Sequence, residues 1–317
     1  MKRARNTLLY ASVMSLVGWL TFSGEALGST PVQSIEASAA DVNPPHHARR
    51  VIRDIVYGQG GGLPLLLDLY LPDEARPPYP AVIFIYHWGG GGQARRHFSP
   101  QATYLVERGI ASAIISYRSS GPATFPTSIE DAKAAVRWMR ANAEEHGIDP
   151  DKIAAAGGSA GAQLAALLGT SGGVTELEGT GGNSTYSSTV NLVIAFNGMF
   201  DMKELHEYSM SAGNRNIADV LEAYVGGTPE QFPEEYEASS PITHIDERDP
   251  PVLLLHGTGD ELVPFEQSLR FKEALEAAGV PVELFEAEGA GHGFFNNAPY
   301  HQATLERMEE FITKYFR

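Results

Sequence analysis

A serine flanked by glycines between two apolar runs is the feature that most constrains how this 317-residue chain can fold. Residues 153–156 are small and apolar, residues 157–161 read G-x-S-x-G with Ser159 at the centre, and residues 162–168 resume as a helix-forming run. This order predicts a strand, a sharp turn and a helix. Because glycines permit strained backbone angles and leave room beside the turn, Ser159 would be presented above a sheet as a nucleophile.

Composition narrows the class of protein. The chain has no cysteine, which excludes disulfides and a cysteine nucleophile. Its formal net charge is −16, and such an acidic surface repels phosphate backbones and anionic lipids, so nucleic-acid and peripheral-membrane roles are disfavoured. A hydrophobic share of 43% is enough for one large core. We therefore expect one catalytic domain.

The N-terminal residues have the composition of a targeting segment. Residues 1–28 combine basic residues near the start, an apolar stretch over 8–22 and small residues at 26–28, which predicts a secretory signal peptide and a secreted or periplasmic protein. The apolar stretch is shorter than the roughly 20 residues of a bilayer span, although an uncleaved leader that anchors the chain stays open. Residues 29–50 are rich in Ser, Ala and Pro and predict a flexible lead-in.

Residues 51–317 have the alternating pattern of an α/β domain. Two β-rich runs, 51–57 and 64–71, predict an opening hairpin. Further strands are expected at 81–86, 111–117, 152–156, 190–196, 252–255 and 282–286, with helices at 100–108, 128–145, 160–168 and 265–278 and a last one near the C-terminus. Alternation of this kind indicates a mostly parallel central sheet with helices on both faces. Residues 197–244 interrupt it and predict a small cap insertion, while residues 172–188 suggest a mobile loop near the pocket.

An acid and a base follow later strands. Asp260 comes after the run 252–255 and His292 after the run 282–286. A serine hydroxyl needs a base to take its proton and a third group to orient that base, and the order Ser, Asp, His is the one expected on such a sheet. The carboxyl ends of parallel strands form one crevice, so Ser159, Asp260 and His292 are predicted to meet there.

Each of these residues has an alternative interpretation. Asp260 could be a turn residue and His292 an ordinary loop histidine. His256 is a rival base, but it precedes Asp260 and would reverse the chain order. Asp201, after the run 190–196, is a rival acid.

A second glycine cluster, residues 89–92, follows the run 81–86 and predicts an oxyanion hole. Backbone N–H groups there could approach a substrate oxygen closely, and Ala160, directly after the nucleophile, would give another donor. A phosphate-binding loop is excluded because no Lys-Ser/Thr follows the glycines. The adjacent His46 and His47 lack a convergent third ligand, so we expect no metal site.

The chain resembles the α/β-hydrolase superfamily from about residue 51 to the C-terminus, in the esterase and lipase branch with an HGGG-type oxyanion motif. More narrowly, Tyr117-Arg118, Phe125-Pro126, Ala135-Val136-Arg137-Trp138, Gly147-Ile148-Asp149-Pro150 and the run 256–264 resemble the bacterial group that includes bifunctional acetylxylan and feruloyl esterases. The resemblance implies that Ser159, Asp260 and His292 are nucleophile, acid and base.

One departure from the family pattern affects the oxyanion hole. The family usually reads His-Gly-Gly-Gly-Trp, whereas this chain reads His87-Trp88-Gly89-Gly90-Gly91. The predicted donors are then Gly89, Gly90 and Ala160, with a shift by one position left open. Trp88, Phe200 and Phe294 are candidates for a pocket wall, with packing in the core as the alternative.

These observations favour a serine carboxylesterase that hydrolyses short-acyl or aromatic esters. The expected substrates are small molecules or polysaccharides, such as acetyl or feruloyl esters of carbohydrates. Catalysis by a Ser-His-Asp set requires no metal or organic cofactor. Two alternatives remain: a serine peptidase of the prolyl-oligopeptidase kind, and an inactive binding protein on the same fold. The sequence does not define the oligomeric state.

Overall fold

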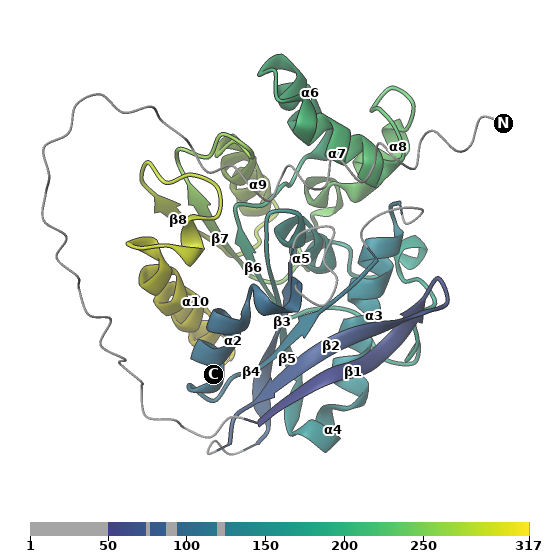
Figure 1. The fold of residues 1–317 in the computed structure, drawn as a ribbon, viewed down its shortest axis with the longest axis vertical. Coiled ribbons are helices and arrows are strands. Elements are labelled where there is room, and N and C mark those ends of the chain that lie inside the picture. Colours follow the sequence, from purple (N-terminus) through teal and green to yellow (C-terminus); the bar gives the residue numbers. More distant parts are fainter. Residues whose placement is uncertain (1–49, 74–76, 87–93, 119–123, 317) are drawn as a thin grey trace, which may run out of the picture. The chain divides into compact units, whose positions relative to one another are not determined.

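The computed structural model describes residues 50–73, 77–86, 94–118 and 124–316, all within the unit His47–Arg317 (Figure 1). The predicted signal peptide and the lead-in up to residue 49 lie outside the described residues, as do Trp88, Gly89 and Gly90.

The centre of the described part is an eight-stranded sheet with the order β1-β2-β4-β3-β5-β6-β7-β8. The strands are β1 Arg50–Gly60, β2 Leu63–Leu71, β3 Tyr79–Ile85, β4 Ala111–Ile115, β5 Ile148–Gly158, β6 Leu192–Phe196, β7 Val252–Gly257 and β8 Val282–Ala287. β1 and β2 form an antiparallel hairpin, β2 also pairs antiparallel with β4, and the pairs from β4 through β3 to β8 are parallel. This confirms the predicted hairpin and the mostly parallel sheet.

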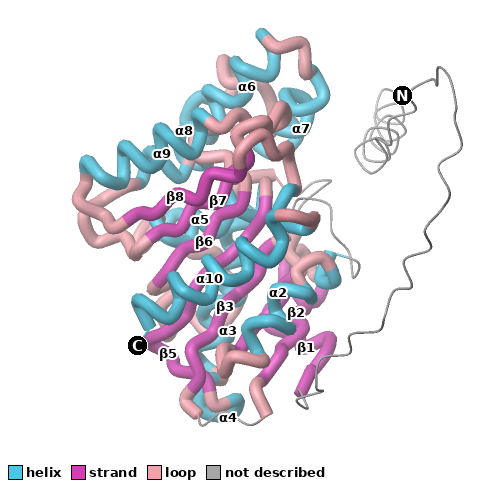
Figure 2. Tube along the Cα trace, turned by 90° about the vertical axis from the view of Figure 1, so that its left-hand side faces the viewer, coloured by secondary structure: helices cyan, strands magenta, loops and turns pink. Residues whose placement is uncertain are grey.

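Helices cover both faces of the sheet because the central strands are apolar on both sides. On β3, Ile83 and Ile85 belong to one buried cluster, and Val82 and Phe84 belong to the other. The first cluster includes side chains of α3 Thr127–Ala141, α5 Ala160–Thr170 and α9 Glu266–Ala277, and the second those of α2 Ser99–Val106 and α10 Tyr300–Phe316. Figure 2 shows α10 lying across the strands. Successive residues of a strand point to opposite faces, so one strand serves both cores.

Several boundaries differ from the sequence prediction. The single helix expected over 128–145 is α3 followed by a short α4 Ala143–His146, which ends at Gly147 in the left-handed region with φ 68°. The strand expected over 152–156 begins earlier, at Ile148, because Ile148 pairs with Tyr79 of β3. Between β6 and β7, in the segment expected to form the cap, lie α6 Met202–Ser211, α7 Arg215–Val225, α8 Pro233–Ser239 and the 3-10 helix η3 Pro241–His244. Three other 3-10 turns are η1 Ala94–Arg96, η2 Thr175–Leu177 and η4 Phe294–Asn296.

The stretch 172–188, which the sequence suggested to be a mobile loop near the pocket, is instead tied to α3. The Lys133 ammonium, with its side chain 1% exposed, donates to the carbonyl of Ser171 and to the carboxylate of Glu178, both at 2.8 Å. The Arg137 guanidinium donates to the Glu178 carboxylate at 2.7 Å and to the Gly182 carbonyl at 3.0 Å. Buried charges of this kind persist only when they are paired, so the stretch and α3 hold each other in place.

Candidate active site

Ser159 occupies the strained turn that its sequence context predicts. It lies between β5 and α5 with φ 57° and ψ −122°, a positive φ that non-glycine residues rarely adopt. Its N–H donates to the Phe196 carbonyl at 2.9 Å, and its own carbonyl accepts from the N–H groups of Ala162 and Gln163. The strain is therefore held by hydrogen bonds to β6 and to the first turn of α5.

The glycines of the motif are required by close packing. A Cβ atom on Gly157 would overlap the carbonyl of Gly161, and one on Gly161 would overlap the carbonyl of Ile85 at the end of β3. A Cβ on Gly158 would lie 2.9 Å from the ring of Phe295. These contacts explain why positions 157, 158 and 161 of the motif are occupied by glycine.

The side chains of Ser159, His292 and Asp260 form a hydrogen-bonded chain. His292 Nε2 lies 3.0 Å from Ser159 Oγ, and His292 Nδ1 lies 2.7 Å from Asp260 Oδ2. A carboxylate only accepts, so Nδ1 carries the proton and Nε2 is left to accept from the serine hydroxyl. The Asp260 side chain is fully buried, whereas that of His292 is 21% exposed. The order nucleophile, base, acid thus runs from the accessible to the buried part of the site.

Asp260 is held as an anion by four nearby donors. Its Oδ1 accepts from the backbone N–H groups of Leu262 and Val263 at 2.9 and 3.0 Å, while Oδ2 faces His292 and lies 3.3 Å from His256 Nε2. Burial acts to raise the pKa of Asp260, but the hydrogen bonds of His256 and His292, the charge of His292 and the Val263 amide outweigh it and hold the pKa well below its ordinary value. The turn interpretation of Asp260 therefore holds for one oxygen while the other contacts the base.

The two rival residues have other partners. His256 is fully buried beneath Asp260, with Nδ1 2.7 Å from Ser268 Oγ and Nε2 3.0 Å from the Val263 carbonyl. Asp201 is the N-cap of α6, where its carboxylate accepts from the Glu204 N–H at 2.9 Å. The described structure thus brings His292, rather than His256, to Ser159, and uses Asp201 to cap a helix.

Asn197 is a site residue that the sequence analysis missed. It directly follows β6, is 1% exposed and has φ 40°. Its side-chain nitrogen lies 3.2 Å from Nδ1 and 3.1 Å from Nε2 of His292. An atom that is equally close to both ring nitrogens, without colliding with the carbon between them, must lie over the face of the ring. The only sequence signal was an asparagine at a strand end, a residue type that tolerates positive φ.

Of the predicted oxyanion donors, Ala160 alone lies in the described residues. It is the first residue of α5, and the first N–H groups of a helix have no partner within that helix. The predicted donors Gly89 and Gly90, with the register question around Trp88, fall in the part of the chain that is not described. Just before that part, the Tyr117 hydroxyl donates to the carbonyl of Tyr86 at 2.6 Å.

The two described pocket candidates lie in the core. Phe200 is fully buried and stacks on Phe271 with ring centroids 4.3 Å apart. Phe294 is 5% exposed and packs edge-on against Phe295 and Tyr300. Their burial and ring contacts favour the packing alternative, because large apolar rings gain most from complete burial.

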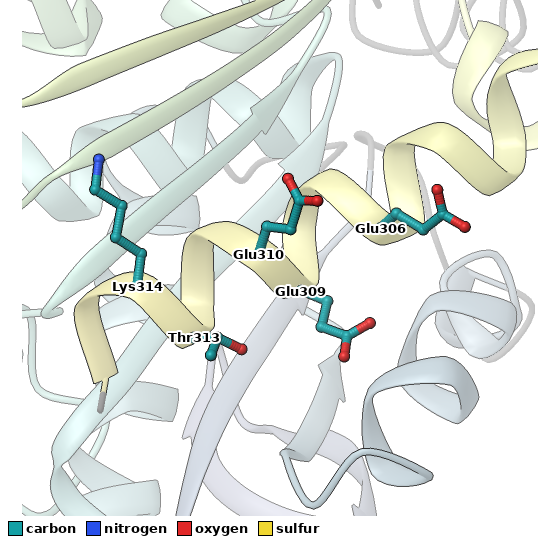
Figure 3. Close-up of a pocket in the computed structure, with 5 residues that line it drawn as sticks. All are labelled: Glu306, Glu309, Glu310, Thr313 and Lys314. Atoms are coloured by element: carbon teal, nitrogen blue, oxygen red, sulfur yellow. The ribbon is translucent and has the colours of Figure 1, made fainter.

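A separate hollow of about 550 Å³ lies along α10 (Figure 3). It is lined by Glu306, Glu309, Glu310, Thr313 and Lys314 and includes none of the three site residues. Within the described residues no group of three or more His, Asp or Glu side chains could hold a metal ion. Over the same residues no helix is long and apolar enough to cross a membrane.

A family model named BD-FAE matches residues 67–275, which include Ser159 and Asp260. The chain belongs to the BD-FAE family. This membership and the sheet topology confirm the resemblance to α/β-hydrolase esterases and the α/β-hydrolase fold. His292 lies beyond the matched residues of the BD-FAE model.

Known relatives and solved structures agree with the BD-FAE assignment. The esterase LipQ of Mycobacterium tuberculosis is 33% identical over 248 residues, covering 76% of this chain and 56% of LipQ. The chain thus spans little more than half the length of that relative. Among solved structures, a bifunctional GH43-CE protein of Bacteroides eggerthii has 34% identity and a TM-score of 0.73, covering 83% of this chain and 38% of that one. The propionate-bound esterase Est2 of Thermogutta terrifontis has 34% identity and a TM-score of 0.68, covering 82% of this chain and 93% of that one.

Proposed function

We propose that this chain is a serine carboxylesterase that hydrolyses short-acyl or aromatic esters through an acyl-enzyme on Ser159. The observation that carries the proposal is the hydrogen-bonded chain from Ser159 Oγ through His292 to the buried Asp260 carboxylate. In this arrangement a base within 3.0 Å of the hydroxyl is oriented by an anion on its other side, which is the requirement for an activated serine.

In the first half-reaction His292 Nε2 accepts the proton of Ser159 as Oγ attacks the acyl carbonyl. The tetrahedral oxyanion would accept hydrogen bonds from the Ala160 N–H and from the glycine run after β3, each worth about 3 kcal/mol in the transition state. His292 then gives its proton to the leaving alcohol. Asp260 keeps the imidazolium oriented and compensates its charge throughout.

In the second half-reaction water replaces the alcohol. His292 takes a proton from the water, the resulting hydroxide attacks the acyl-enzyme, and the acid leaves as Ser159 regains its proton from His292. No step needs a metal or an organic cofactor. In each half-reaction His292 Nε2 first takes up a proton and then gives it to the leaving group, so His292 is the base in both half-reactions.

We further propose carbohydrate-linked esters, acetyl or feruloyl, as the substrate class. Support comes from the family assignment and from a similar solved structure titled as a truncated carbohydrate esterase from gut microbiota, with 28% identity and a TM-score of 0.72. The leader composition supports a secreted or periplasmic location, where such polymers are met. The location is tested by fractionating cells that produce the full chain and sequencing the N-terminus of the protein in each fraction. A protein that stays in the cytoplasm and still begins at Met1 would contradict the proposed location.

The substrate proposal is tested by kcat/KM of the protein without residues 1–28 on p-nitrophenyl acetate and on methyl ferulate. Ser159→Ala is the blank, and its activity should fall at least about a thousandfold. A strong preference for the acetate supports a narrow acyl pocket and deacetylation, whereas comparable ferulate turnover supports an aromatic-ester role. Full activity of Ser159→Ala would contradict the mechanism. Cleavage of prolyl peptides in preference to esters would support the peptidase alternative, and no turnover on any substrate would favour a binding protein.

A further inference from the structure

We infer that His256 is a positioning residue for the acid of the proposed site, and that it fixes the Asp260 carboxylate in the orientation that His292 requires. The inference rests on the proposed esterase function. His256 is the last but one residue of β7, four residues before Asp260, and its ring is fully buried. It is a histidine that the proposed reaction itself does not use.

The partners of His256 define which of its nitrogens carries the proton. Nε2 lies 3.0 Å from the carbonyl oxygen of Val263, which can only accept, so Nε2 is protonated. Nδ1 lies 2.7 Å from Ser268 Oγ on α9, and the serine hydroxyl is free to donate to it. A neutral His256 ring thus donates through Nε2 towards Val263 and Asp260 and accepts through Nδ1 from Ser268. No charge has to be buried beside that of the Asp260 carboxylate.

This N–H closes a small ring of contacts around the carboxylate. The Val263 carbonyl accepts from His256, and the Val263 N–H donates to Asp260 Oδ1 at 3.0 Å. His256 Nε2 is itself 3.3 Å from Asp260 Oδ2, the oxygen that accepts from His292. The backbone turn therefore fixes one carboxylate oxygen, and His256 lies against the other.

The His256 ring also has contacts with Phe265 and Ser268. Edge-on packing against Phe265, at 5.7 Å between ring centroids, holds the imidazole plane, and Ser268 ties it to α9. Among the described residues, Asp260 is the titratable side chain that contacts His256. Rotation of the carboxylate would thus break contacts with β7, with its own turn and with His292 at once.

The test compares His256→Leu and His256→Gln with the wild-type protein on p-nitrophenyl acetate. Leucine removes the N–H, whereas a glutamine amide can still donate to Val263 and Asp260. We expect kcat to fall about 10- to 100-fold in His256→Leu with KM nearly unchanged, because only the alignment of the acid is lost. His256→Gln should recover most of the loss. Active-site titration with a phosphonate ester gives the fraction of folded, reactive Ser159.

The pH profile separates positioning from mere stability. Without the His256 N–H, more of the charge of Oδ2 is directed at His292, so the acidic limb of kcat/KM should move to higher pH by about half a unit. His244→Leu is the matched control, because His244 Nε2 also donates to a backbone carbonyl, that of Ala238, at 2.8 Å, and this contact lies away from Asp260. That variant should leave the limb and kcat unchanged.

Two results would overturn the inference. One is a folded His256→Leu protein with wild-type kcat and an unmoved acidic limb; the other is an equal loss in the Leu, Gln and His244→Leu variants. If His256→Leu does not fold, Ser268→Ala takes its place, with an expected loss of about threefold, and wild-type behaviour there overturns the inference too. Failure of the proposed function is distinct, because wild type itself would then show no Ser159-dependent hydrolysis.

Discussion

Gly161 and Ile85 are in such close contact that any side chain at position 161 would overlap the carbonyl oxygen of Ile85. Ile85 ends β3, and Gly161 lies in the first turn of α5. The contact therefore fixes the serine turn against the strand that leads to the predicted oxyanion glycines. One backbone contact thus holds the turn that carries Ser159 against the end of β3.

A Gly161→Ala substitution should destabilise the protein by about 3 kcal/mol, because the added methyl group meets backbone rather than a flexible side chain. Thermal unfolding measures the effect. Gly172→Ala is the control, since a Cβ there would meet only the Thr189 side chain, at 3.5 Å. Equal unfolding temperatures for the two variants would show that α5 can shift away from β3.

Asp260→Asn should lower kcat about 10⁴-fold while the protein stays folded, because a neutral amide neither fixes the Nδ1–H tautomer of His292 nor balances the imidazolium. Since the pKa of Asp260 is held well below its ordinary value, the wild-type acid stays ionised throughout the range in which histidines titrate. The matched control is Asp201→Asn, a helix cap that asparagine can replace. A smaller loss for Asp260→Asn than for Asp201→Asn would remove Asp260 from the mechanism.

The parts of the site that could be predicted are the residues whose place in the fold follows from the order of strands and helices along the chain. Ser159, Asp260 and His292 each follow a strand of the parallel part of the sheet, and parallel strands end at one edge, so their meeting requires no knowledge of side-chain packing. The tight turn at Ser159 could also be predicted, because glycines on both sides of a serine are typical of a sharp strand-to-helix turn. The sheet could be predicted for the same reason, since its apolar runs are long and regularly spaced.

The remaining features depend on contacts between distant residues that no local pattern records. Asn197 contacts His292 although the two residues are 95 positions apart in the sequence. The positive φ of Asn197 could not be predicted from the sequence either. Phe200 was a candidate for a pocket wall or for the core, because an aromatic side chain after a strand can equally face a crevice or a core. The stretch 172–188 has the composition of a mobile loop, and its attachment depends on two cations of α3.

Asn197→Gly should lower kcat several-fold with little change in KM, because glycine accepts the positive φ of this position but removes the amide that lies over the His292 ring. Steady-state kinetics on p-nitrophenyl acetate measures this. Asn183→Gly is the control, as Asn183 also has positive φ, at 53°, within the stretch 172–188. Unaltered kcat in Asn197→Gly would mean that the other contacts of His292 suffice to hold its ring.

Glu178→Gln should destabilise the protein by about 1–2 kcal/mol at pH 7, because it leaves the buried Lys133 and Arg137 side chains without their carboxylate. Burial acts to raise the pKa of Glu178, but hydrogen bonds from Lys133 and Ser188 and the charge of Arg137 lower it overall. A lowered pKa contributes stability above the unfolded value, near 4.5, and that stability is lost as the pH falls through the folded value. Urea unfolding at pH 7 and pH 3 should show a difference between wild type and variant that shrinks at pH 3, and a constant difference would contradict the ionic origin.

Asp249→Asn should have the opposite pH dependence. Burial, with a contribution from the Asp246 charge, raises the pKa of Asp249 to about 6. A raised carboxyl pKa means that the folded state holds the proton more tightly, so stability is lost as the pH rises from about 4 to about 6 and does not return above it. Asparagine avoids this loss and can still accept from the Asp246 N–H, which Asp249 now does at 2.9 Å.

The expected gain for Asp249→Asn is no more than about 1 kcal/mol at pH 8, since solvent screens part of the effect at this half-buried position, and a gain of that size raises Tm by about 2–4 °C. Thermal unfolding of wild type and variant at pH 8 and pH 4 measures it, with equal Tm values expected at pH 4. Asp246→Asn is the control, because the pKa of Asp246 is lowered by the hydrogen bonds that its carboxylate accepts from Arg248, so that substitution should reduce stability at pH 8. A variant at position 249 that is less stable than wild type at pH 8 would mean that the Asp249 carboxylate is stabilised by its surroundings rather than destabilised by burial.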